Sequence, residues 1–165
     1  MLTHSKMCGL ETAKNRIERY KQQGKKIVFT NGCFDILHVG HVDLLQRAKE
    51  LGDILVLGLN SDTSVKNQGK GDDRPFNTYE ARAFVLAHLE SVDIVVSFDE
   101  DTPIKLIEAF VPHVLVKGGD WRIENIVGRE IVEDNGGKVY SLPLIQGYST
   151  TNLADKIAKT HHVSK

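Results

Sequence analysis

The sequence of 165 residues has little of what several protein classes require. Its two cysteines, Cys8 and Cys33, are too few for a disulfide framework or a paired zinc motif, so we expect a reducing, cytoplasmic location. The 21 lysines and arginines nearly balance the 22 aspartates and glutamates, and the net charge of -1 gives no sign of a nucleic-acid-binding surface. Apolar runs such as residues 54–57 are far too short to cross a bilayer, and the first residues lack the apolar core of a secretory signal. We therefore expect a globular protein without nucleic-acid or membrane partners.

The chain also lacks the two commonest phosphate-binding loops. Neither G-x-G-x-x-G nor G-x-x-x-x-G-K-[ST] occurs in it, which excludes the usual dinucleotide dehydrogenases and P-loop kinases. Internal repeats, low-complexity tracts and Pro/Ser-rich linkers are absent as well. We expect one domain over residues 1–165, with a helical N-terminal extension over 1–24, a catalytic core over 25–158 and a tail over 159–165.

What the sequence does contain is a regular alternation of short apolar runs and helical patterns. The runs predict strands over residues 26–30, 53–60, 92–98, 111–119 and 138–142. Helical spacing, glycine stops and capping residues predict helices over residues 11–24, 39–52, 78–91, 103–110, 126–135 and 150–159. Continuous apolar strands separated by helices indicate a parallel sheet that is covered on both faces. We therefore predict an α/β fold with a doubly wound, Rossmann-like sheet of five parallel strands.

Ligands of such sheets bind beyond the carboxyl ends of the strands. In this chain the predicted strand ends are Thr30, Asn60, Phe98, Lys117 and Leu142. The polar stretch 61–77, after the second predicted strand, is long for a connection within a compact domain. We predict a loop there that closes over a bound ligand, because its cations can neutralise phosphate charge and exclude water.

The motif NGCFDILHVGH (residues 31–41) directly follows the first predicted strand. His38 and His41 bracket the first turn of the next predicted helix, where free backbone amides and the helix dipole favour a phosphate. Gly40 lets that helix begin close to a ligand, and imidazoles can donate hydrogen bonds to oxygens that gain charge during a reaction. We interpret the pair as a clamp for a polyphosphate undergoing substitution. Two surface histidines, or a zinc site that includes Cys33, are the alternatives.

Two further stretches suit a nucleotide. GYSTTN (147–152) places three hydroxyls, at residues 149–151, at a predicted helix start, where they can accept from helix amides and donate to a phosphate. A plain helix cap by Ser149 is the simpler reading. KGGD (117–120) ends the fourth predicted strand, and its glycines expose backbone that could read a base edge, although a structural turn fits equally well. The neighbouring Trp121 either covers this pocket or belongs to the core.

Six blocks, in order, make the sequence similar to a known family. They are FTNGCFDILHVGH (29–41), LNSD (59–62), KGDDRPFN (70–77), VDIVVSFDEDTP (92–103), LVKGGDW (115–121) and GYSTTNL (147–153). The first carries the H-x-G-H signature of the cytidylyltransferase-like nucleotidyltransferases. Within that group the sequence most resembles the D-glycero-β-D-manno-heptose 1-phosphate adenylyltransferases, and the resemblance covers roughly residues 25–158.

The resemblance implies transfer of AMP from ATP to that sugar 1-phosphate, which gives pyrophosphate and ADP-heptose, a precursor of lipopolysaccharide. It implies Mg²⁺ as a cofactor, held mainly by the triphosphate rather than by a metal site of the protein, and a cytoplasmic homodimer. One alternative is a cytidylyltransferase acting on a polyol or amino-alcohol phosphate such as glycerol 3-phosphate. Related glycerol-phosphate enzymes, however, carry an Arg-Thr pair where this chain has Leu144 and Ile145. Another alternative, of a different class, is a nucleotide-binding sensor without turnover.

The same resemblance implies roles for individual residues. His38, His41 and a lysine of the polar stretch, Lys70 or Lys66, are expected to assist the transfer. Contacts with the nucleotide are expected for Thr30, Asn31, Gly32, Cys33, Phe34, Asp35, Gly40, Arg82, Lys117, Gly118, Gly119, Asp120, Gly147, Tyr148, Ser149, Thr150 and Thr151. Lys66 and Arg74 are expected to bind the sugar phosphate.

Overall fold

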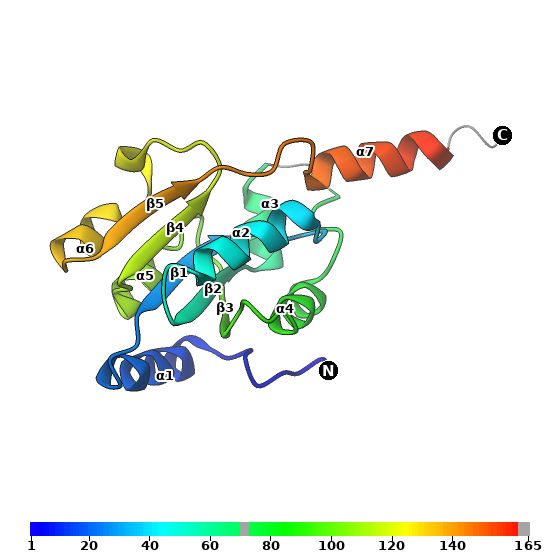
Figure 1. Ribbon diagram of the computed structural model, residues 1–165. Helices are drawn as coiled ribbons and strands as arrows, with labels where there is room; N and C mark the ends of the chain where they lie inside the picture. The colour runs from blue at the N-terminus through cyan, green and yellow to red at the C-terminus, as the bar shows by residue number, and fades with distance from the viewer. Residues whose placement is uncertain (70–72, 162–165) are drawn as a thin grey trace.

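The computed structural model describes residues 1–69 and 73–161 (Figure 1). The sheet consists of β1 Ile27–Gly32, β2 Ile54–Asn60, β3 Ile94–Phe98, β4 Val114–Gly118 and β5 Lys138–Leu142. Around it lie α1 Leu10–Gln22, α2 Val39–Lys49, α3 Asp62–Asn67, α4 Tyr79–Ala87, α5 Ile104–Phe110, the 3₁₀ helix η1 Ile123–Asn125, α6 Arg129–Asp134 and α7 Thr150–His161. Along the described ranges, none of these helices has the length and apolar character that crossing a bilayer requires. The predicted α/β class is confirmed.

The strand order is β3-β2-β1-β4-β5, and every pairing is parallel, as predicted for a doubly wound sheet. Strands β2 and β3 extend the sheet from β1 in one direction, whereas β4 and β5 extend it in the other. The order therefore reverses between β1 and β4, which pair at the centre of the sheet. Ligands of open α/β sheets bind outside the carboxyl ends of the strands at such a reversal. The ends of β1 and β4 are consequently where a site is expected.

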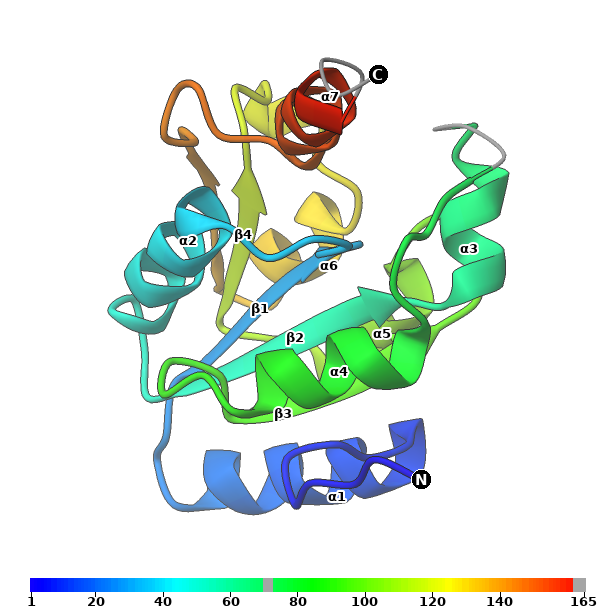
Figure 2. The same cartoon turned by 90° about the vertical axis from the view of Figure 1, so that its right-hand side faces the viewer.

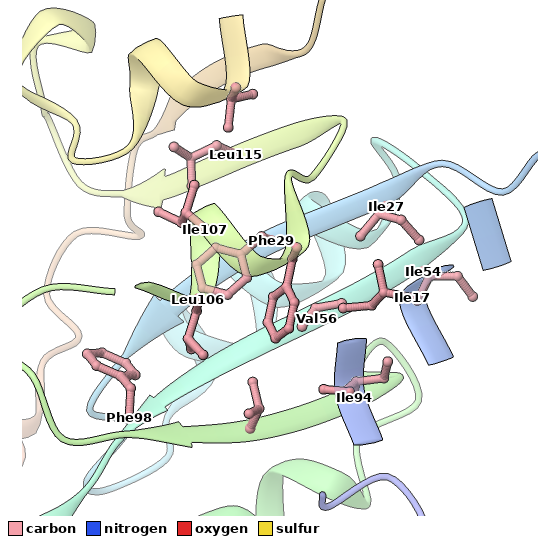
Figure 3. Packing of buried hydrophobic residues seen from close by; sticks show 14 of the residues in the cluster. Ile17, Ile27, Phe29, Ile54, Val56, Ile94, Phe98, Leu106, Ile107 and Leu115 are labelled. Atoms are coloured by element: carbon pink, nitrogen blue, oxygen red, sulfur yellow. The ribbon is translucent and has the colours of Figure 1, made fainter. Parts of the chain in front are cut away.

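Helices cover both faces of the sheet, and side chains alternate between the faces along each strand. On one face, Ile27, Phe29 and Leu115 pack with side chains of α1, α5 and α6 (Figure 3). On the other face, Val28 and Val116 pack with side chains of α2 and α4. All five of these strand residues are buried. Both faces of the central strands are therefore apolar, which explains why these strands read as uninterrupted apolar runs.

The N-terminal segment contains a helix, α1, that packs against this core. Ala13 and Ile17 of α1 are fully buried against the sheet. Ahead of α1, the Val95 N–H of β3 donates to the Lys6 carbonyl at 2.8 Å, and the Val95 carbonyl accepts from the Cys8 N–H at 3.1 Å. The segment thus lies along the outer edge of β3 (Figure 2). That edge would otherwise expose unpaired backbone groups.

The prediction of a loop throughout residues 61–77 is wrong, and several predicted boundaries differ from those of the structure. The polar stretch after β2 is not a loop throughout, because it contains α3. Ser61 caps this helix by accepting from the Ser64 N–H at 3.2 Å, and Ser64 and Val65 are buried. The cap and the burial stabilise a helix whose short sequence has no clear helical periodicity. Among the boundaries, the helix predicted over 78–91 ends at Ala87, the helix predicted over 126–135 begins at Arg129, and α5 begins at Ile104, with Pro103 at the capping position.

Candidate active site

His38 and His41 lie at the N-terminus of α2, directly beyond the carboxyl end of β1. His38 is the residue that precedes the helix, and its carbonyl accepts the first helical hydrogen bond, from the His41 N–H at 2.9 Å. The two imidazole rings stack, with centroids 3.7 Å apart and planes inclined by 21°. A Cβ added to Gly40 would lie 3.2 Å from the His38 ring and 3.6 Å from Cβ of Tyr148. The glycine therefore permits the close approach of the two segments.

Both imidazoles favour the neutral form. Burial lowers the pKa of His41 to about 4, helped by the neighbouring His38 and opposed in part by the Ile36 backbone. Burial also lowers the pKa of His38. At pH 7 each ring is thus neutral and still donates one N–H. Among the described residues, Thr30 Oγ1 and His38 Nδ1 are buried without a hydrogen-bond partner, a condition that is uncommon unless a ligand or water completes the site.

A pocket of about 440 Å³ opens in front of the histidines. It is lined by Cys33, Phe34, Asp35, His38, His41, Val65, Arg74, Leu144, Tyr148, Ser149, Thr150 and Thr151. These residues follow β1, β2 and β5, which is where the strand-end rule predicts them. Nine of the twelve lining residues had been expected to touch the nucleotide or to assist transfer, and Arg74 to bind the sugar phosphate. The volume falls in the range of roughly 300–1,000 Å³ that is typical of small-molecule sites.

The N-terminus of α7 forms the wall opposite α2. Ser149 caps this helix, since its Oγ accepts from the Asn152 N–H at 3.0 Å, as the simpler reading predicted. Gly147 has a positive φ of 85°, which turns the chain toward the pocket just before Tyr148. Thr150 Oγ1 donates to the Ile36 carbonyl at 3.4 Å, a contact that joins the α7 terminus to the histidine motif. Two helix N-termini therefore face one pocket.

Asp35 holds the chain that follows the polar stretch. Its buried carboxylate accepts from Arg74 at 3.1 Å and from the N–H groups of Phe76 and Asn77, each at 2.9 Å. The Arg74 guanidinium also lies over the Phe76 ring, 4.2 Å from its centroid. The carboxylate is thus occupied by protein donors. This geometry gives Asp35 the part of positioning Arg74 at the pocket wall.

Arg82 is a buried crosslink between loops. Its guanidinium is fully buried and donates to the carbonyls of Cys33 at 2.7 Å, Asn60 at 2.8 Å and Asn77 at 3.0 Å, and to the Asp62 carboxylate at 2.7 Å. These partners belong to the segments after β1 and β2 and before α4. Arg82 does not line the pocket in front of the histidines. Its expected contact with the nucleotide stays a prediction, while the structure shows that it joins these segments.

The remaining strand-end residues divide between two sides of the sheet. Asn31 and Lys117 line a second, smaller pocket of about 190 Å³, together with Trp121. They continue the register of Phe29 and Leu115, whose side chains pack on the α5 face. Trp121 is 49% exposed, which decides against the core alternative for this residue.

Gly118 lies on the opposite face, where an added Cβ would come within 2.5 Å of Leu44 of α2. Its neighbour Gly119 bonds to β5 through its N–H, which donates to the Leu142 carbonyl at 2.8 Å. Asp120 is exposed beyond this turn, and Gly32 closes β1. The KGGD stretch is therefore partly a structural turn. Its expected nucleotide contacts stay predictions.

The geometry does not distinguish between Lys66 and Lys70, of which one is expected to assist transfer. Lys66 is exposed on α3 and lines neither of these two pockets. Lys70 lies outside the described residues. The choice between them stays open.

Two residues of the second pocket, Asp101 and Thr102, had not been singled out from the sequence. They follow β3, so the strand-end rule could have found them. The described part of the chain contains no group of three or more His, Cys, Asp or Glu side chains that could hold a metal ion. Cys33 instead donates to Gln68 Oε1, with the two atoms 3.2 Å apart. The zinc alternative for the histidine motif therefore has no ligand set here.

Comparisons with known proteins agree with this geometry. The sequence profile of the cytidylyltransferase-like family matches residues 29–154. A curated relative from Geobacter sulfurreducens, bifunctional protein HldE, is 52% identical over 157 residues, and its namesake from Geobacter metallireducens is 54% identical. Each match covers 95% of this chain and 32% of the relative, so the chain spans about a third of the relatives' length.

Solved structures give the same answer for the fold. The lipopolysaccharide core biosynthesis protein from Thermoplasma volcanium GSS1 superimposes with a TM-score of 0.60 at 27% identity, covering 76% of this chain and 100% of that one. A pantoate-beta-alanine ligase from Francisella tularensis gives a TM-score of 0.60 at 17% identity, covering 93% and 77%, which shows the fold alone. The profile match over most of the chain and the identity to the HldE proteins together show that the chain belongs to the cytidylyltransferase-like family.

Proposed function

We propose that the protein is a nucleotidyltransferase that transfers AMP from ATP to D-glycero-β-D-manno-heptose 1-phosphate, giving ADP-heptose and pyrophosphate. The observation that carries this proposal is the stacked, neutral pair His38 and His41 at one helix N-terminus, facing a second, hydroxyl-bearing helix N-terminus across a pocket of about 440 Å³. Two helix dipoles that converge on one cavity suit a polyphosphate.

In the proposed reaction the β- and γ-phosphates bind between the N-termini of α2 and α7. An oxygen of the sugar phosphate attacks the α-phosphorus in line. The new P–O bond forms as the bond from that phosphorus to the α,β-bridging oxygen breaks, and the electron pair leaves with pyrophosphate. His38 and His41 donate hydrogen bonds to oxygens that gain negative charge during this step. Catalysis then consists of positioning and charge stabilisation, without a covalent enzyme intermediate.

Magnesium fits this scheme as part of the substrate complex MgATP. The acidic side chain at the pocket, Asp35, is already engaged by Arg74 and two backbone N–H groups. Mg²⁺ prefers to keep several waters and to bind substrate phosphates. The ion would therefore be held by the triphosphate and water, and it would neutralise part of the developing charge.

The choice of sugar and of pathway rests on the family resemblance and on relatives. The HldE proteins are 52% and 54% identical to the chain, and the Thermoplasma volcanium protein is described as acting in lipopolysaccharide core biosynthesis. We extend this role to the present chain, together with a cytoplasmic location and a homodimer. Because the chain spans about a third of the HldE relatives, the proposal concerns the nucleotidyl transfer alone.

Pyrophosphate release, measured over four nucleotides and several phosphorylated sugars and polyols, tests the proposal. We expect turnover with ATP and heptose 1-phosphate, and a kcat/KM for ATP at least tenfold above that for CTP, which corresponds to about 1.4 kcal/mol. Leu144 at the pocket wall, in place of a cation, supports this choice over the glycerol-phosphate type. If CTP equals or exceeds ATP, the cytidylyltransferase alternative replaces the proposal. Nucleotide binding without pyrophosphate release under any condition would identify a sensor.

A further inference from the structure

Asn77, the residue before the Thr78 cap of α4, is bonded to Asp35 at two points. Its backbone N–H donates to Asp35 Oδ1 at 2.9 Å, and its side-chain amide donates to the Asp35 carbonyl at 2.6 Å. Two hydrogen bonds between the same two residues fix their relative orientation better than one bond does. The end of the polar stretch 61–77 is therefore fastened to the histidine motif at Asn77.

The guanidinium of Arg74 is the group that this arrangement holds. It donates to Asp35 Oδ2 at 3.1 Å and lies over the Phe76 ring, 4.2 Å from its centroid. The Phe76 N–H donates to the same carboxylate oxygen at 2.9 Å. The Arg74 side chain is only 13% exposed, and Arg74 lines the pocket in front of the histidines. Its place at the pocket wall therefore follows from the places of Asp35, to which Asn77 is bonded, and of Phe76, which directly precedes Asn77.

Asn77 also connects this arrangement to the buried crosslink that Arg82 forms. The Asn77 carbonyl accepts from Arg82 Nε at 3.0 Å, and the same guanidinium donates to the Cys33 carbonyl at 2.7 Å. Cys33 and Asp35 both belong to the motif that follows β1. The segment before α4 is thus joined to this motif from two sides, and a displacement of Asn77 would be transmitted to Asp35.

The exposure of Asn77 separates an effect on the reaction from an effect on folding. Asn77 is exposed, whereas Asp35 and Arg82 are buried. Substitution of an exposed residue usually changes the stability of a protein little. A misplacement of about 1 Å in a group that positions a substrate can nevertheless lower the rate by about 10²-fold. Loss of turnover in a folded Asn77 variant would therefore report on geometry.

We propose that Asn77 is a positioning residue for the nucleotidyl transfer, because it holds the Arg74 guanidinium, through Asp35 and Phe76, at the pocket wall where this cation meets the phosphate charge of the bound substrates. Asn77 itself lines neither of the two pockets at the strand ends. It therefore acts through Arg74 rather than by touching a substrate. The inference rests on the proposed nucleotidyl transfer.

A double-mutant cycle tests whether Asn77 acts through Arg74. We expect Asn77→Ala to lower kcat/KM for pyrophosphate release about tenfold or more, and Arg74→Met at least as much. The double variant should stay within about threefold of Arg74→Met alone, since a cation that has been removed cannot also be misplaced. Losses that multiply in the double variant overturn the inference, because they would show that Asn77 acts independently of Arg74. Wild-type kcat/KM in Asn77→Ala overturns it as well.

Two further variants sharpen this cycle. Asn135→Ala is the matched control, because Asn135 is an exposed asparagine at the end of α6 whose side-chain amide donates to a backbone carbonyl, that of Ile131, at 2.8 Å. It should retain the wild-type kcat/KM. Asn77→Asp keeps the size of the side chain but lacks the donating amide, so it should behave like Asn77→Ala. It takes the place of that variant if circular dichroism shows that Asn77→Ala has unfolded.

Amide hydrogen exchange gives a readout that does not require turnover. The Phe76 N–H is bonded to Asp35, so loss of the Asn77 amide should loosen this segment and speed the exchange of that N–H by about threefold or more. Exchange at the wild-type rate in Asn77→Ala overturns the inference, whatever the kinetics show. A wild-type protein that releases no pyrophosphate contradicts the nucleotidyl transfer, whereas faster exchange in Asn77→Ala would still show that Asn77 holds the segment around Arg74.

Discussion

At the scale of single residues, the candidate site contains two imidazoles whose pKa values are lowered, so that both favour the neutral form. Stacked rings 3.7 Å apart could not both be protonated without strong repulsion, and burial favours the neutral form of each. Neutral rings act as hydrogen-bond donors rather than as fixed cations. In the proposed transfer, the free energy that they contribute would be directed to the charge that develops during the reaction, and less to the binding of the ground-state triphosphate.

We expect His38→Ala and His41→Ala each to lower kcat by about 10²-fold or more, because the loss of one preorganised donor to a developing oxyanion typically has that effect. Steady-state pyrophosphate release gives kcat. His88→Ala is the matched control, since His88 is an exposed imidazole at the end of α4 and away from the strand ends. Turnover within a few-fold of wild type in both site variants, with native circular dichroism, would contradict the assigned role.

At the scale of secondary-structure elements, the loops around the candidate site are joined to one another by a single buried side chain, that of Arg82. Arg82 on α4 joins the segments after β1 and β2 through the carbonyls of Cys33 and Asn60. Its removal would leave these carbonyls, and the charge of Asp62, without their partner. Buried polar groups that lose a charged partner are costly, whereas exposed ion pairs contribute little.

We therefore expect Arg82→Met to lower the free energy of unfolding by about 3 kcal/mol or more, the size seen when one partner of a buried ionic network is removed. Arg129→Met is the control, because Arg129 forms a surface pair with Glu133 four residues along α6. It should cost less than about 1 kcal/mol. Urea titration followed by circular dichroism measures both, and equal losses in the two variants would show that Arg82 is not a structural crosslink.

The elements that sequence could predict are those with a strong periodic pattern. All five strands follow from apolar runs, and the Ser149 cap follows from its place before a helical pattern. The helix α3 was missed because its stability comes from the Ser61 cap and from the burial of Ser64 and Val65. Such burial depends on the rest of the fold and leaves no periodic trace in six residues.

The division of the site residues was less predictable still. Lys117 and Gly118 are adjacent in β4, so alternation alone places them on opposite faces of the sheet. The sequence does not show which face each of the two residues takes, because a strand that is apolar on both faces carries no alternating pattern. Whether Arg82 reaches a ligand or is buried likewise depends on which loops fold over it.

At the scale of the whole molecule, the lowered histidine pKa values couple stability to pH. Burial is the leading cause for His38, His41 and His113. His113 Nδ1 also accepts from the Ile27 N–H at 2.9 Å, which requires an unprotonated nitrogen. A histidine with a lower pKa in the folded than in the unfolded state lets the unfolded chain take up more protons as the pH falls. The stabilisation that the neutral histidines contribute is therefore complete at pH values above 6.5, the ordinary pKa of histidine. It is lost as the pH falls toward about 4, the pKa of His41 in the folded protein.

We expect the urea midpoint of the wild-type protein to fall steadily between pH 7 and pH 4.5. Carboxylates contribute to this loss as well, so His41→Gln, whose side chain does not titrate, isolates the part that belongs to His41. The variant should lose less stability over the interval than the wild-type protein. Parallel losses in the two proteins would mean that the His41 pKa is not lowered by folding.

The alternation of side chains at the ends of β1 and β4 also bears on how this site can diverge. Point substitutions at Asn31 or Lys117 change the lining of the smaller pocket and leave that of the larger pocket intact, so the two pockets can diverge independently. A single-residue insertion or deletion within either strand has the opposite effect, because it exchanges the faces of every position beyond it. Replacement at these strand ends therefore alters one pocket at a time, whereas a length change in either strand would disturb both pockets together.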